Sequence, residues 1–169
     1  MICDLCPRRC GALRTEERGL GRCRMPELPV LARAALHRWE EPPISGTRGS
    51  GTIFFSGCSL GCVFCQNRKI SRREAEGQNI TVDALAKTFL SLEKKGAHNI
   101  NLVTGAHYVP QIIEALQIAR KQGLSLPVVY NSSGYEQVET LQLLDGHIDI
   151  YLPDYKYYSS YYAGLYSHA

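Results

Sequence analysis

The sequence predicts an α/β fold in which about four parallel strands alternate with helices, preceded by a small Cys-rich module. Three observations carry this prediction. From residue 51 onward, short apolar runs alternate with segments of helical periodicity. A polar or Cys-containing segment follows each of these apolar runs, and all seven cysteines lie within the first 65 residues. The expected organisation is therefore a metal-binding module over residues 1–24, a connector over 25–50 and an α/β unit over 51–169.

Length and composition favour one domain of moderate charge. The chain has 169 residues, of which 44% are hydrophobic, and its formal net charge is +3. Such a chain can bury one sizeable core. A net charge of this size does not indicate nucleic acid or an anionic membrane as a partner. No apolar run reaches the length of a membrane span, and the N-terminus lacks the apolar core of a signal peptide, so we expect a cytoplasmic protein.

The first 24 residues carry four cysteines in the spacing Cys3-x2-Cys6-x3-Cys10-x12-Cys23. An odd total of seven cysteines leaves one unpaired in any disulfide framework, whereas a division into four and three matches two metal sites. Four thiolates suit zinc or a second iron-sulfur cluster, and the spacing leaves both open. The arginines of this segment are interpreted as a solvated surface; a nucleic-acid face is less favoured because interleaved aromatic residues are missing.

Residues 25–50 are expected to form a Pro/Gly-rich connector. One extended piece is predicted at Val30 to Trp39, ended by the pair Pro42-Pro43. Trp39 is the only tryptophan, and we expect it to anchor packing rather than to contact a ligand.

The α/β unit is predicted element by element from periodicity and from end signals. The expected strands are short apolar runs at residues 53–55, 99–103, 127–130 and 148–152. Thr81 caps the first expected helix, which Gly96 ends, and Pro110 lies in the first turn of the second, which ends at Gly123. A short third helix is expected over residues 136–144.

The segments after the four strands are expected to share one site, because the carboxyl ends of parallel strands meet at one edge of a sheet. These segments are 58–65, 104–107, 131–134 and 154–156. The first holds Cys58, Cys62 and Cys65 in a C-x3-C-x2-C spacing. Three thiolates on one tight loop can hold three irons of a 4Fe-4S cluster and leave the fourth iron open. An open metal position is typical of a site that binds a substrate.

The segment Cys58-Ser-Leu-Gly-Cys62-Val-Phe64-Cys65 resembles the signature loop of the radical S-adenosylmethionine (radical SAM) superfamily. The resemblance implies that the three cysteines ligate a 4Fe-4S cluster. It also implies that the open iron chelates the amino and carboxylate groups of S-adenosylmethionine (SAM), and that Phe64 lies near the adenine.

Further pieces resemble the pyruvate formate-lyase-activating-enzyme-like group of that superfamily. They are Cys-x-x-Cys-Pro-Arg-x-Cys at the N-terminus, Phe64-Cys-Gln-Asn67, Asn101-Leu-Val-Thr104, Tyr130-Asn-Ser-Ser-Gly134 and Asp154-Tyr-Lys156. The Cys loop is a specific signal, whereas the later pieces are individually weak and carry weight through their order.

This resemblance implies that Asn131 and Ser132 contact SAM and that Asp154 and Lys156 lie near its ribose and carboxylate. Ordinary turn chemistry is the alternative for Asn131 and Ser132, and a solvated ion pair is the alternative for the other two. His107 is a candidate donor to ligand or substrate, with a locally hydrogen-bonded histidine as the alternative. A carboxylate that many relatives carry at this turn is missing from Thr104-Gly-Ala-His107.

By this resemblance the protein is an enzyme that cleaves SAM reductively to a 5′-deoxyadenosyl radical, which abstracts a hydrogen atom. The implied partners are an external electron donor and a glycyl radical enzyme as protein substrate. The alternative function is a non-catalytic fragment that binds iron-sulfur or zinc and serves in interaction or assembly.

The family domain has more βα units than this sequence supplies, so residues 51–169 are expected to form an incomplete (β/α) partial barrel. We expect a truncated or interrupted gene product, or a fragment that needs a second chain. Seven of the ten tyrosines lie from Tyr151 onward. This Tyr-rich segment and an open strand edge predict exposed apolar surface and self-association.

Overall fold

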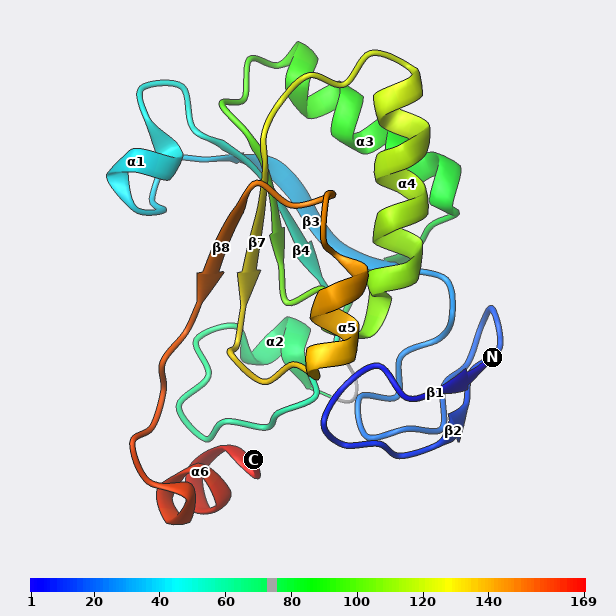
Figure 1. Ribbon diagram of the computed structural model, residues 1–169, viewed down its shortest axis with the longest axis vertical. Helices are drawn as coiled ribbons and strands as arrows, with labels where there is room; N and C mark the ends of the chain where they lie inside the picture. The colour runs from blue at the N-terminus through cyan, green and yellow to red at the C-terminus, as the bar shows by residue number, and fades with distance from the viewer. Residues whose placement is uncertain (73–75) are drawn as a thin grey trace.

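The computed structural model describes residues 1–72 and 76–169. Its centre is a six-stranded sheet, with α3 and α4 packed side by side against one face (Figure 1). The strands follow the spatial order β5 (Gln78–Asn79), β3 (Val30–His37), β4 (Ser50–Phe55), β6 (Ile100–Val103), β7 (Val128–Ser132) and β8 (Ile150–Pro153).

The predicted set of parallel strands is confirmed. Strands β4, β6, β7 and β8 are parallel neighbours, and Ile53, Leu102 and Tyr130 lie in register across them. The sheet also contains two antiparallel strands, β3 and β5. Strand β3 is the extended piece expected within the connector, and it pairs along the full length of β4. It thereby covers an edge of the parallel set that would otherwise present unpaired backbone groups.

The helices begin and end where their sequence signals indicate. Helix α3 (Val82–Lys94) is capped by the Thr81 hydroxyl, which accepts from the Ala84 amide at 3.2 Å. Helix α4 (Val109–Lys121) has Pro110 in its first turn. Gly96 and Gly123 follow these helices with φ of 85° and 99°, which favours glycine after a helix. Helix α5 (Val138–Leu143) is the short third helix.

The main core lies between the sheet and helices α3 and α4. Ile53, Leu102 and Val128 project from the sheet and are fully buried, as are Phe89 of α3 and Ile112 of α4. Burial of such side chains stabilises the fold by about 1.5–3 kcal/mol each. Because neighbouring strand residues alternate between faces, Phe54, Val103 and Asn131 project from the opposite face. That face borders the candidate site.

The N-terminal module is a small hairpin that docks onto the α/β unit. Strands β1 (Ile2–Cys3) and β2 (Ala12–Leu13) pair antiparallel. The module contacts α5 through backbone oxygens, since Gln137 Nε2 donates to Cys6 O at 2.7 Å and Thr140 Oγ1 donates to Leu5 O at 2.9 Å. The Arg8 Nε donates to Ser59 O in the Cys loop at 2.9 Å.

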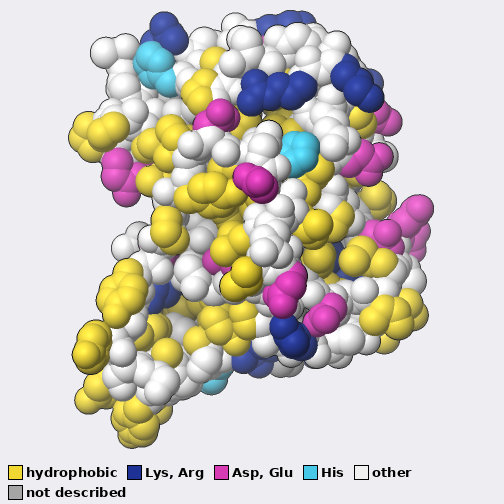
Figure 2. All heavy atoms as spheres, in the orientation of Figure 1, with side chains coloured by type: hydrophobic (Ala, Val, Ile, Leu, Met, Phe, Trp, Pro, Cys, Tyr) yellow, Lys and Arg dark blue, Asp and Glu magenta, His cyan; other side chains and the backbone are white. Residues whose placement is uncertain are grey.

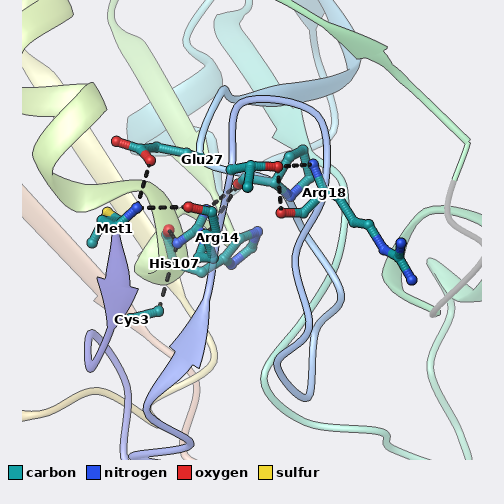
Figure 3. A network of polar contacts seen from close by, with 8 residues as sticks. Met1, Cys3, Arg14, Arg18, Glu27 and His107 are labelled. Atoms are coloured by element: carbon teal, nitrogen blue, oxygen red, sulfur yellow. Dashed lines mark hydrogen bonds and ion pairs between the residues drawn. The ribbon is translucent and has the colours of Figure 1, made fainter.

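Arg14 links this module to the rest of the chain from a fully buried position (Figure 3). Its guanidinium donates to Pro26 O, to His107 O at 2.5 Å and to Cys3 Sγ at 3.6 Å. It also lies over the Tyr108 ring, with 5.1 Å to the ring centroid. Arg14 therefore differs from the solvated surface that the sequence suggested for this group of arginines.

The remaining helices are short, and among them η1 contributes Tyr108 to the core. They are α1 (Pro42–Ser45), α2 (Arg68–Ser71), the 3-10 turn η1 (Ala106–Tyr108) and α6 (Ser160–Ser167). Trp39 is 89% exposed, so its prediction as a packing anchor is wrong. Within the described residues, no helix combines the length and apolarity needed to cross a membrane.

Candidate cofactor site

A cavity of about 620 Å³ lies at the carboxyl ends of the parallel strands. It brings together most of the residues that the sequence proposed for one site. Its lining includes Cys58, Cys62, Phe64, Cys65, Asn131, Ser132, Asp154 and Lys156. Its volume falls within the roughly 300–1,000 Å³ of small-molecule sites.

The three cysteines come from the loop between β4 and α2, and each sulfur has one polar neighbour. The Leu60 amide donates to Cys58 Sγ at 3.4 Å. A hydrogen bond of 3.2 Å joins Cys65 Sγ and Ser71 Oγ. The Ser167 hydroxyl donates to Cys62 Sγ at 2.8 Å. The loop, α2 and α6 each supply one of these polar neighbours.

The surroundings of Cys58 perturb the pKa of its thiol. The pKa of Cys58 is raised to about 11, mainly by burial and also by the charges of Cys62 and Cys65, while the Leu60 amide and Lys156 oppose this rise. A raised pKa keeps the free thiol protonated at neutral pH. Because a thiolate is the metal ligand, metal binding must displace that proton, as in metal sites generally.

The ends of β6 and β7 supply polar groups whose hydrogen bonds are local. Asn131 Nδ2 donates to Glu40 Oε2 at 3.3 Å. Ser132 Oγ donates to Glu136 Oε2 at 3.1 Å and accepts from the Gly134 amide at 3.2 Å, which is turn chemistry. Thr104, which also lines the cavity, has a φ of 59°. This conformation is strained for a β-branched residue, and such strain clusters at functional sites.

Asp154 and Lys156 form an ion pair just after β8. Their side chains are 58% and 23% exposed, so both remain open to the cavity and to solvent. Gly134 permits this arrangement, because its φ is 70° and a Cβ there would lie 2.4 Å from Asp154 O.

Sequence reasoning missed His37 and Glu40, which line the same cavity from the end of β3 and from the segment that follows it. Their side chains lie 4.0 Å apart, and Glu40 is the acceptor for Asn131. Burial raises the pKa of Glu40, while His37 lowers it. Both belong to the expected connector, and no local pattern marks them, because their position depends on how that connector folds back over the sheet.

His107 lies outside this cavity. It is 2% exposed, and its Nε2 lies 2.8 Å from Ser56 O. A carbonyl only accepts, so Nε2 carries the proton. Burial and the nearby Arg14 lower the pKa of His107 to about 4. His107 is therefore a locally hydrogen-bonded histidine, which was the alternative to its role as a donor to ligand or substrate.

The four N-terminal cysteines lie near one another in the docked module. The pKa of Cys6 is raised to about 11, mainly by burial, with smaller contributions from the charges of Cys23, Cys3 and Cys10. Cys23 also lines a second cavity, of about 340 Å³, together with Cys58. Across residues 1–72 and 76–169, no three His, Cys, Asp or Glu side chains are arranged to hold a metal ion.

A parallel βα unit whose strand ends carry a C-x3-C-x2-C loop beside a cavity of small-molecule size is the arrangement expected of iron-sulfur proteins that bind a small ligand beside the cluster. The sequence model of the radical SAM superfamily matches residues 52–161, so the chain belongs to that superfamily. The chain is also 34% identical, over 160 residues, to the uncharacterized protein MJ0674 of Methanocaldococcus jannaschii. The match covers 92% of this chain and 45% of that protein, so the chain spans about half the length of this relative.

Membership implies a 4Fe-4S cluster and SAM. The residues present fit these groups, because three thiols, several amide and hydroxyl side chains and one ion pair border a cavity of suitable volume. Membership gives no support to the alternative of a non-catalytic module.

Proposed function

We propose that Cys58, Cys62 and Cys65 ligate the 4Fe-4S cluster and that SAM occupies the cavity beside it. The observation that carries this proposal is the shared cavity, which joins the Cys loop to the ends of β7 and β8. When bound, the cluster and SAM supply a one-electron cleavage of the sulfonium for hydrogen abstraction.

The chain's own side chains bind and orient the ligand. Lys156 pairs with the SAM carboxylate, and Asp154 accepts from its ribose hydroxyls. Asn131 donates an amide proton from the floor of the cavity, and Phe64 offers an aromatic face to the adenine. Phe64 is 55% exposed and lies 6.2 Å from the Tyr157 ring, which leaves one face open to a base.

The hydrogen donor in this proposal is a glycine of a partner protein, which would become a glycyl radical. Support comes from the motifs shared with the activating-enzyme-like group, Phe64-Cys-Gln-Asn67 and Asp154-Tyr-Lys156. The exposed tyrosines of the C-terminal segment supply apolar surface for a protein partner or for self-association (Figure 2, lower left). These are Tyr151, Tyr155, Tyr158, Tyr161, Tyr162 and Tyr166.

The N-terminal cysteines form a second metal site in this proposal, for zinc or an auxiliary cluster. Support comes from Arg14, whose buried guanidinium forms no ion pair with a carboxylate among the described residues. A buried cation without an anion is costly, and Cys3 Sγ, 3.6 Å from the guanidinium, is a neighbouring group that can become an anion. A tetrathiolate site would supply that charge after the four thiols converge on one metal.

Anaerobic reconstitution with iron and sulfide tests both sites. With a strong reductant and SAM, the chain should release 5′-deoxyadenosine, and the Cys62→Ala variant should release none. Cys10→Ser should lose the metal of the N-terminal module and keep the cluster signal of the loop. Retention of a full cluster signal in Cys62→Ala would refute the ligand assignment, and unchanged metal content in Cys10→Ser would refute the second site.

A further inference from the structure

The C-terminal helix α6 packs on the Cys loop through polar contacts (Figure 1, bottom). The Val63 amide donates to Tyr166 O at 2.9 Å, one residue after Cys62. The only fully buried side chain of α6 is Ser167, whereas Tyr161, Leu165 and Tyr166 are 71%, 51% and 41% exposed. Burial of these three apolar side chains therefore does not account for the position of α6. The hydrogen bonds to the Cys loop contribute to holding the helix in place.

Ser167 forms a hydrogen-bond chain with a fixed direction. Its hydroxyl lies 2.8 Å from Cys62 Sγ and 2.7 Å from the Tyr157 hydroxyl. A serine has one hydroxyl proton, which Ser167 donates to the sulfur. Tyr157 must then donate its own proton to Ser167 Oγ. The positive end of two aligned O–H dipoles thus points at Cys62, and such chains strengthen their members.

This arrangement affects a cluster bound at the loop. Hydrogen bonds to the sulfurs and solvent exposure are among the factors that set the reduction potential of an iron-sulfur cluster. Groups behind metal ligands also orient them, and changes to such groups alter metal affinity. Reduction adds one electron, so a donor at a ligating sulfur favours the reduced state. Cys62 receives this donor from a side chain that is shielded from water.

We infer that Ser167 is a positioning residue that orients Cys62 toward the cluster and raises the reduction potential of that cluster. This inference rests on the proposed function, because it requires a cluster at the Cys loop. It assigns to α6 a role in easing one-electron reduction by the external donor. Tyr157 supports Ser167 by donating to it.

A redox titration followed by EPR tests this inference on the reconstituted full chain. In Ser167→Ala the ratio of reduced to oxidised cluster, measured at the wild-type midpoint potential, should fall about tenfold, which corresponds to a midpoint lower by about 59 mV. Tyr157→Phe should also lower the midpoint potential, but by a smaller amount. Ser160→Ala is the matched control, because Ser160 is exposed on the same helix, and it should leave the midpoint unchanged.

An unchanged midpoint in a loaded Ser167→Ala chain would overturn the inference. If Ser167→Ala fails to hold the cluster, Ser167→Thr, which retains a hydroxyl, should regain it, and failure of both variants would overturn the role of the hydroxyl. The measurement needs no SAM cleavage. If SAM does not change the EPR signal of the loaded wild-type chain, the proposed function fails and this inference stands. If a loaded Ser167→Ala chain has the wild-type midpoint potential, this inference fails and the proposed function stands.

Discussion

Replacing Arg14 by methionine should destabilise the folded chain by about 3 kcal/mol. Methionine keeps much of the buried volume but removes the donors to Pro26 O and His107 O, two buried carbonyl groups. A hydrogen bond from a charged donor contributes about 1.5–3 kcal/mol, so two of them give roughly 3–6 kcal/mol. Methionine carries no charge, so the variant avoids the cost of burying a cation, and this offsets part of that loss. For a chain of this size, 3 kcal/mol corresponds to a melting temperature lower by roughly 6–12 °C.

The assay is thermal and urea unfolding followed by circular dichroism, with Arg18→Met as the matched control. Figure 3 shows the Arg18 side chain turned away from the network, and Arg18 is exposed. An exposed substitution of this kind should change stability by less than about 0.5 kcal/mol. If Arg14→Met and Arg18→Met unfold at the same temperature, Arg14 does not fasten the N-terminal module, and the reasoning from its burial is refuted.

Three further predictions concern single residues. The pKa of His107 is about 4 in the folded chain and near 6.5 in the unfolded chain, so the unfolded chain binds more protons between these pH values. The free energy of unfolding should therefore fall by about 3 kcal/mol as the pH drops from 6.5 to 4, which urea midpoints across this range measure. A His107→Gln chain with the same pH dependence would contradict this prediction. Thr104→Gly should raise stability by up to about 1 kcal/mol by relieving its left-handed backbone, and a loss of more than 1 kcal/mol in urea unfolding would count against strain at this turn. Lys156→Met should weaken SAM binding by calorimetry about tenfold, whereas the exposed Lys87→Met should not; equal affinities would remove Lys156 from the site.

Local patterns predicted the parts of the fold that local physics determines. Thr81, Gly96 and Pro110 mark helix ends because their own side chains and backbones satisfy the terminal groups. The Cys loop was recognisable because all three thiols lie within eight residues of one another. The strand ends followed from the rule that parallel strands gather their carboxyl ends at one edge.

Features that depend on distant partners could not be predicted in this way. Arg14 is buried because His107, 93 residues later, offers its carbonyl. Glu40 reaches the cavity because the segment after β3 folds back toward Asn131. Trp39 lies in that same segment and is left in solvent. Ser167 contacts Cys62 across 105 residues, and nothing in its local sequence marks it.

The central claim is that Cys58, Cys62 and Cys65 hold a cluster whose open iron binds SAM. The most direct measurement is the EPR spectrum of the reduced, reconstituted chain before and after SAM is added. The account predicts that SAM changes the g values of the wild-type spectrum and that Cys62→Ala shows no cluster signal from the loop. A wild-type spectrum that is identical with and without saturating SAM would contradict it.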